Sequence, residues 1–92
     1  KREEVLAAAI KIVSGDREEI YGPPADNLGD IAKYWSIFTR TELTADDVCS
    51  MLEIQKISRR RQTPGYMDNY VDAAGYAALG YELANAIENL DT

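Results

Sequence analysis

The fold is decided by residues 44–89, which read TADDVCSMLEIQKISRRRQTPGYMDNYVDAAGYAALGYELANAIEN. Thr44, followed by two aspartates, has the pattern of a helix N-cap with an acidic residue three positions on. The sequence TPG at 63–65 favours a turn and ends that helix. The pattern therefore predicts one helix over 45–61 and another over 67–89, joined by a short turn and packed as an antiparallel pair.

The two predicted helices differ in how their apolar residues are distributed. In the helix over 45–61 they spread around much of the circumference, so we expect this helix to be central. The helix over 67–89 alternates bulky with small residues, and small residues at three- and four-residue spacing let helices approach closely. Gly75 and Gly80 each cost about 1 kcal/mol relative to alanine inside a helix. Each therefore needs a reason, which is either close packing or close approach to a ligand.

Two further helices are expected before this pair. Apolar residues recur at helical spacing over 3–14, behind an acidic pair that suits a helix N-terminus. A second stretch over 25–39 carries one apolar stripe, in which Trp35 is the expected core anchor. Two prolines at 23–24 separate them. With no strand alternation and no repeat, residues 1–92 are predicted to form a single all-α domain, a compact four-helix bundle.

The composition narrows the classes of function. Ten Lys and Arg against 16 Asp and Glu give a net charge of −6, which disfavours a nucleic-acid partner. No apolar run reaches membrane-spanning length, so no membrane partner is expected. The chain has no histidine and only one cysteine, Cys49, which fits a reducing cytoplasm. Any catalysis would have to use carboxylates, Lys, Arg and Tyr, and any metal would be a hard ion such as Mg²⁺ or Mn²⁺.

Charged residues from the two last helices should meet. Glu53, Lys56 and Arg60 share one stripe of the first, while Asp68 and Asp72 are four apart on one face of the second. Antiparallel packing would bring these groups together. Two interpretations stay open: the carboxylates hold Mg²⁺, which recruits polyphosphate, or Asp72 forms a buried structural salt bridge with Arg60 or Lys56 and nothing is bound.

The basic run of Lys56 and residues 59–61 locally reverses the net charge. It is either a solvated helix C-terminus that complements the helix dipole, or a phosphate clamp for a small nucleotide. Tyr21 and Tyr76 are the candidates for stacking on a base or ribose, with aromatic core packing as the alternative.

Seven separated motifs occur in order along the chain. They are Ser14-Gly15-Asp16-Arg17, Tyr21-Gly22-x-Pro24, Asn27-Leu28, Ile31-Ala32-x-x-Trp35, Asp47-Val48, Lys56-Ile57-x-Arg59 and Asp68-Asn69-x-x-Asp72-x-x-Gly75-Tyr76-Ala77. In this order they resemble a family of short phage and prophage proteins, over about residues 10–85. That family is distantly similar to the MazG-like all-α nucleotide pyrophosphohydrolases, whose second metal box resembles the acid-x-x-Asp of the last helix.

The resemblance implies a four-helix core, Mg²⁺-dependent hydrolysis of a nucleoside triphosphate to the monophosphate and pyrophosphate, and a dimer or tetramer. The protein would then act in the cytoplasm, that of the host cell if phage-encoded. The implied metal ligands are Glu53, Asp68 and Asp72, and the implied catalytic residues are Glu53 and Asp72. The candidate nucleotide-binding residues are those chosen above by residue type, namely Lys56, Arg60, Tyr21 and Tyr76.

The sequence departs from the pyrophosphohydrolase pattern at Lys56, where the second glutamate of an E-x-x-E box is expected. A cation there weakens a metal site, and the lysine could contact phosphate directly. Two alternatives to the hydrolase therefore remain, a non-enzymatic module that binds or sequesters a nucleotide and a structural or protein-interaction bundle.

Overall fold

The computed structural model describes residues 1–16, 20 and 22–91, and within this part of the chain all regular structure is helical. The elements are α1 (Arg2–Lys11), a π-helical turn η1 (Ile12–Asp16), α3 (Pro24–Thr39), α4 (Ala45–Arg59) and α5 (Met67–Asp91). The prediction of an all-α fold with four helices is confirmed. The first helix differs most from its expected range, because α1 ends at Lys11 and is followed by η1, in which Gly15 kinks the chain.

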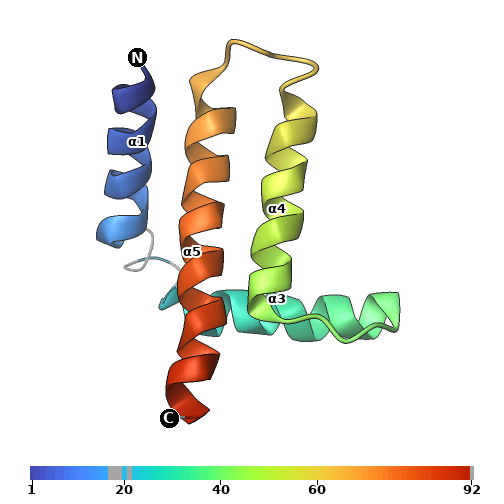
Figure 1. The fold of residues 1–92 in the computed structure, drawn as a ribbon. Helices are drawn as coiled ribbons and strands as arrows, with labels where there is room; N and C mark the ends of the chain where they lie inside the picture. Colours follow the sequence, from blue (N-terminus) through green and yellow to red (C-terminus); the bar gives the residue numbers. More distant parts are fainter. Residues whose placement is uncertain (17–19, 21, 92) are drawn as a thin grey trace.

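α1, α5 and α4 stand side by side, and α3 runs crosswise to α5 and α4 (Figure 1). α4 and α5 form the expected antiparallel pair, and α1 lies on the other side of α5. α3 crosses at the end of α4 that is remote from the α4–α5 turn.

The helix that lies between two upright neighbours is α5, so the prediction that the helix over 45–61 is central is wrong for the single chain. The reason lies in the small residues of α5. A Cβ built on Gly75 would lie 3.6 Å from Val13 Cγ1, and one on Gly80 would lie 3.3 Å from Cys49 Cβ. Glycines on two sides of α5 thus let η1 and α4 both pack closely against it.

A capping box starts α4 as predicted. Thr44 Oγ1 accepts a hydrogen bond from the Asp47 amide at 3.2 Å, and the Asp47 carboxylate accepts one from the Thr44 amide at 2.9 Å. The helix ends at Arg59 rather than at residue 61, because the amides of residues 60–62 bond to carbonyls three residues back and tighten the chain into turns.

Two residues at the start of α5 hold the α4–α5 turn. The buried Asn69 donates from Nδ2 to Thr63 Oγ1 at 3.1 Å, and the Tyr70 hydroxyl donates to the Pro64 carbonyl at 2.8 Å. These side-chain bonds fix where α5 begins relative to α4, and so fix which residues of the two helices meet.

The core lies where α3, α4 and α5 meet. Its buried members are Leu28, Ala32, Val48, Cys49 and Leu83. Trp35, the expected anchor, packs against this cluster while remaining half-exposed. Among the described residues, no helix is both long and apolar enough to span a lipid bilayer.

Candidate functional site

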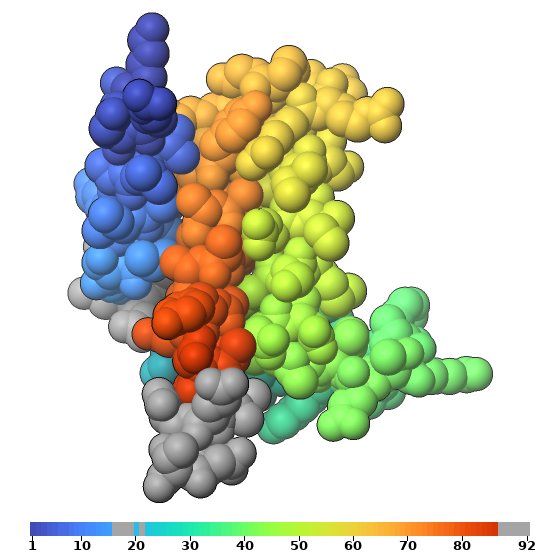
Figure 2. Space-filling model, viewed as in Figure 1, coloured from blue at the N-terminus to red at the C-terminus, as the bar shows by residue number. Residues whose placement is uncertain are grey.

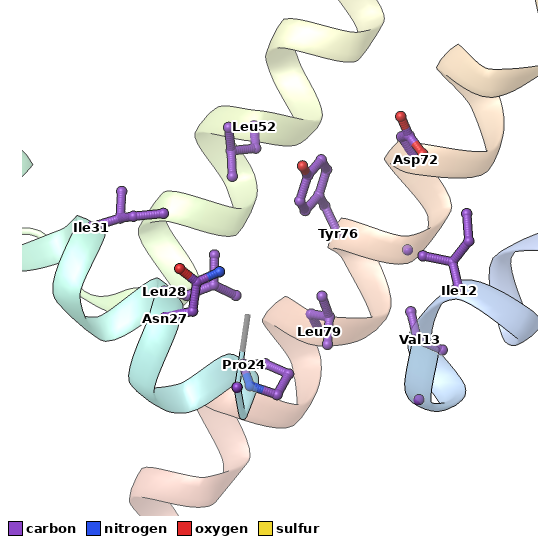
Figure 3. Close-up of a pocket in the computed structure, with 13 residues that line it drawn as sticks. Ile12, Val13, Pro24, Asn27, Leu28, Ile31, Leu52, Asp72, Tyr76 and Leu79 are labelled. Atoms are coloured by element: carbon purple, nitrogen blue, oxygen red, sulfur yellow. The ribbon is translucent and has the colours of Figure 1, made fainter. Parts of the chain in front are cut away.

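A cavity of about 250 Å³ opens between η1, α3 and α5, with one side chain of α4 completing its wall (Figure 3). Its lining is mostly apolar. The residues that line it are Ile12, Val13, Gly15, Gly22, Pro24, Asn27, Leu28, Ile31, Leu52, Asp72, Gly75, Tyr76 and Leu79.

Two glycine turns build the side of the cavity between α1 and α3. Gly15 has φ of 153° and Gly22 has φ of 81°, both in the region that favours glycine. Pro24 then starts α3, a position where its missing N–H is not needed. The two glycines thus contribute backbone, without side chains, to this part of the lining.

Three side chains bring polar atoms into this apolar lining: Asn27 from α3, and Asp72 and Tyr76 from α5. The Tyr76 ring projects from α5 toward Leu52 of α4, and Asp72 lies one turn earlier on the same helix (Figure 3). An aromatic face, an amide and a carboxylate around an apolar space suit a flat ring that carries N–H groups.

Asp72 is held by a cation from α4. Lys56 Nζ lies 2.9 Å from Asp72 Oδ2, and the two side chains are 14% and 25% exposed. This is the salt bridge that the sequence left open as an alternative, but it stands at the wall of a cavity. The ion pair keeps the carboxylate oriented and balances its charge beside the apolar lining.

Arg60 lies one helical turn beyond Lys56. Its guanidinium carbon is 4.1 Å from the centroid of the Tyr70 ring, a cation–π contact. Its Nε is buried and has no hydrogen-bond partner among the residues that the structure describes. The guanidinium is therefore held against the Tyr70 ring.

The predicted magnesium ligands are not gathered at one point. Asp68 is exposed and accepts a hydrogen bond from the Tyr66 hydroxyl at 3.0 Å, which raises the pKa of Tyr66. Glu53 lines a second hollow of about 190 Å³, separate from the first except that Tyr76 lines both.

Residues 1–16, 20 and 22–91 thus contain no group of three or more Asp, Glu, Cys or His placed to hold a metal ion. Within this chain, the carboxylates do not fit the three-ligand Mg²⁺ site that the resemblance implied, since Lys56 and Tyr66 engage two of them.

Tyr21, expected to stack on a base, lies outside the described residues. Conversely, several cavity residues were not expected at a site. Asn27 was only part of a motif, and Ile12, Val13, Leu52 and Leu79 look like ordinary core residues in the sequence. The signal that could have found the cavity is the set of motifs itself, because nine of the 13 lining residues belong to them.

Comparisons with known proteins agree with the phage resemblance. The family model of a domain of unknown function, DUF6378, matches residues 4–84. Two similar proteins, both named Gene 55 protein, come from Mycobacterium phages D29 and L5, with 35% identity over 75 residues and 36% over 76. Each match covers 82% of this chain and 50% or 49% of the relative, so the chain spans about half the length of these curated relatives. No solved structure matches.

Proposed function

The chain belongs to the DUF6378 family of phage proteins, and we propose that it binds a nucleotide, with the base in the cavity between η1, α3 and α5. The observation that carries this proposal is that motifs from five separate segments of the sequence line one cavity. Residues scattered from 15 to 76 along the chain meet there, and three of them carry polar side chains.

The size and polarity of the cavity favour a base over a phosphate group. At about 250 Å³ it is smaller than the roughly 300–1,000 Å³ typical of pockets that enclose a drug-sized ligand. It therefore has room for one ring system. Leu28 and Tyr76 offer faces for a flat ring, while Asp72 accepts hydrogen bonds from its N–H groups. A phosphate group would meet mainly apolar walls and the Asp72 carboxylate.

The phosphate end of the ligand belongs on the side of α4. Lys56 already reaches the cavity wall through Asp72, and Arg60 stands one turn, about 5.4 Å, further along the helix. The guanidinium of Arg60 supports a phosphate contact, because its planar fork of N–H donors matches phosphate oxygens. Basic residues that the sequence grouped as a phosphate clamp would thus serve the same ligand as the cavity.

The arrangement supports binding more than hydrolysis. Asp72 is paired with Lys56, and Glu53 faces the second hollow. A non-enzymatic nucleotide-binding or sequestering module is therefore our proposal, and pyrophosphohydrolase activity is the alternative that the experiment must separate from it.

A thermal-shift panel of nucleoside mono-, di- and triphosphates, with and without Mg²⁺, tests the proposal. We expect at least one nucleotide to raise the melting temperature without pyrophosphate release, and Tyr76→Leu to reduce that rise. The matched control is Tyr81→Leu on the same helix, whose side chain is exposed and does not line this cavity. Pyrophosphate release that Asp72→Asn abolishes would instead establish the hydrolase. No shift with any nucleotide would leave a structural or protein-interaction bundle.

A further inference from the structure

The C-terminal half of α3 is apolar and uncovered, and we propose that a second copy of this chain packs against it. Its three large apolar side chains, Tyr34, Ile37 and Phe38, are 71%, 77% and 88% exposed. In Figures 1 and 2 this part of α3 stands out beyond α4, away from the other helices. It is therefore a helix end that the single chain leaves without a partner.

The apolar surface of α3 extends to two sides of the helix. Leu28 and Ala32 face the core and are buried. Ile37 is nine residues from Leu28, which at 3.6 residues per turn places it on the opposite side. Tyr34 and Phe38 lie between these two directions. A helix that is apolar on both sides is buried on both sides in the assembled protein. A single chain buries only one side of α3.

α4 shows the same excess. Its outward residues Met51, Ile54 and Ile57 are exposed, although their spread around the helix predicted a central position. α3 and α4 contact each other, so a second copy packed on α3 would lie beside α4 as well. It would give α4 a further neighbour, as the spread of its apolar residues predicts.

The accessible area of the chain is consistent with a missing partner. The chain exposes 6938 Å², whereas a compact monomer of 10.2 kDa exposes about 5,300 Å². Each chain thus exposes more area than a compact monomer does, and this excess adds up to roughly 3,000 Å² over two chains. Homodimers that are obligate bury about 2,000–5,000 Å². The excess exposed area is thus large enough for the interface of a stable dimer.

The charges beside Ile37 are self-complementary, which favours a second copy over an unrelated partner. Lys33 and Arg40 flank the apolar residues, and Glu42 follows in the turn after α3. Among the described residues, none of these three charges takes part in an ion pair. If two α3 helices cross antiparallel between Ile37 and Phe38, Lys33 lies opposite Glu42 of the partner subunit. A two-fold contact makes this pair twice.

Sedimentation equilibrium of the purified chain tests the proposal. We expect a mass of twice 10.2 kDa, and we expect Phe38→Asp to raise the dissociation constant at least about 100-fold, because two phenylalanines lose their cover per dimer. Leu6→Asp on α1, an exposed apolar residue outside the surface, is the control and should leave the mass unchanged. A monomer at every concentration, or a dimer that Phe38→Asp does not weaken, would overturn the proposal.

A charge exchange separates a two-fold pair from general stickiness of the surface. Lys33→Glu should raise the dissociation constant about tenfold by placing like charges opposite each other, and the double variant K33E/E42K should restore it. Both residues are exposed, so neither change threatens folding of the chain. If the losses of affinity in K33E and in E42K simply added up in the double variant, the antiparallel α3 contact would be refuted. It would also be refuted if another segment of a longer chain covered the same face of α3.

Discussion

Gly75 and Gly80 lie five residues apart on α5 but are glycines for different reasons. A Cβ on Gly80 would lie 3.3 Å from Cβ of the buried Cys49, which has little freedom to move. A Cβ on Gly75 would make an ordinary contact of 3.6 Å with Val13, and Gly75 lines the cavity. Of the two reasons that the sequence allowed, close packing applies to Gly80, and room beside the cavity applies to Gly75.

The two glycines should respond differently to alanine. Gly75→Ala is expected to raise the free energy of unfolding by up to about 1 kcal/mol, because alanine favours the helix and the added methyl fits. Gly80→Ala gains the same helix propensity but must displace Cys49, so it should be the less stable of the two variants. Urea unfolding of both variants measures the difference. Equal gains in both would contradict the assigned packing of α4 against α5.

The Lys56–Asp72 ion pair should show energetic coupling. In a double-mutant cycle with Lys56→Met and Asp72→Asn, we expect a coupling free energy of about 1–2 kcal/mol, because both side chains are mostly buried. The control cycle is Arg2→Met with Glu3→Gln, an exposed pair at 3.6 Å that should show no measurable coupling. The free energies come from urea unfolding. Independent effects at 56 and 72 would show that the pair is not formed in solution.

The Cys49 thiol links stability to alkaline pH. Burial, together with the nearby Asp46 and Glu53 carboxylates, raises its pKa from 9.0 to about 11. Below pH 9 the thiol is neutral in both folded and unfolded chains, so its contribution is fully present. Between pH 9 and 11 only the unfolded chain loses the proton, and stability must fall as pH rises. The loss should be smaller in Cys49→Ala, measured by urea unfolding across this range. An identical pH dependence in both proteins would contradict the burial of this thiol.

The sequence predicted the site only in part at this scale. Helical spacing and the antiparallel hairpin were enough to bring Asp72 near Lys56 and Arg60, but not to show which of the two it pairs with; the structure shows Lys56. They were not enough to place the cavity, since part of its lining comes from Gly15 and Gly22, which have positive φ. Periodicity does not encode such turns, and nor does it reveal that Tyr66 and Lys56 engage two of the expected metal ligands.

Among the elements, α4 has the start that its sequence predicts most fully. The capping box joins Thr44 and Asp47 through two hydrogen bonds. The C-terminal end was predicted two residues too late, because basic residues continue the helical pattern although the backbone has already tightened into turns. A side-chain cap can be predicted from the residue types at the start of a helix. The last turn of a helix depends instead on the direction that the chain takes afterwards.

Loss of the cap should lower stability without altering the fold. Thr44→Ala is expected to cost about 1 kcal/mol of unfolding free energy, because the Asp47 amide loses its acceptor. Thr41→Ala, three residues earlier in the same connection and outside the cap, is the control and should cost less. Chemical denaturation gives both values. A Thr44→Ala variant as stable as the control would mean that the cap is not formed.

At the scale of the whole molecule, the orientation of α3 is the main difference from the bundle that the sequence predicts. The helical content follows from the sequence, yet α3 crosses α4 and α5 instead of lying alongside them. Its crossing opens the cavity on one side and leaves Ile37 and Phe38 uncovered on the other. Apolar periodicity predicts which face of a helix is buried but not whether its own chain or a second copy covers it, so the position of the helix over 45–61 was misjudged.

The central claim is that the cavity receives the base of a nucleotide, and amide chemical shifts in a nucleotide titration test it most directly. In ¹H–¹⁵N spectra we expect saturable changes at the backbone amides of Asp72 and Tyr76 and at the side-chain amide of Asn27, the three polar residues of the lining. Tyr76→Leu should weaken them. Changes confined to the basic residues 59–61, or none at saturating nucleotide, would contradict the claim.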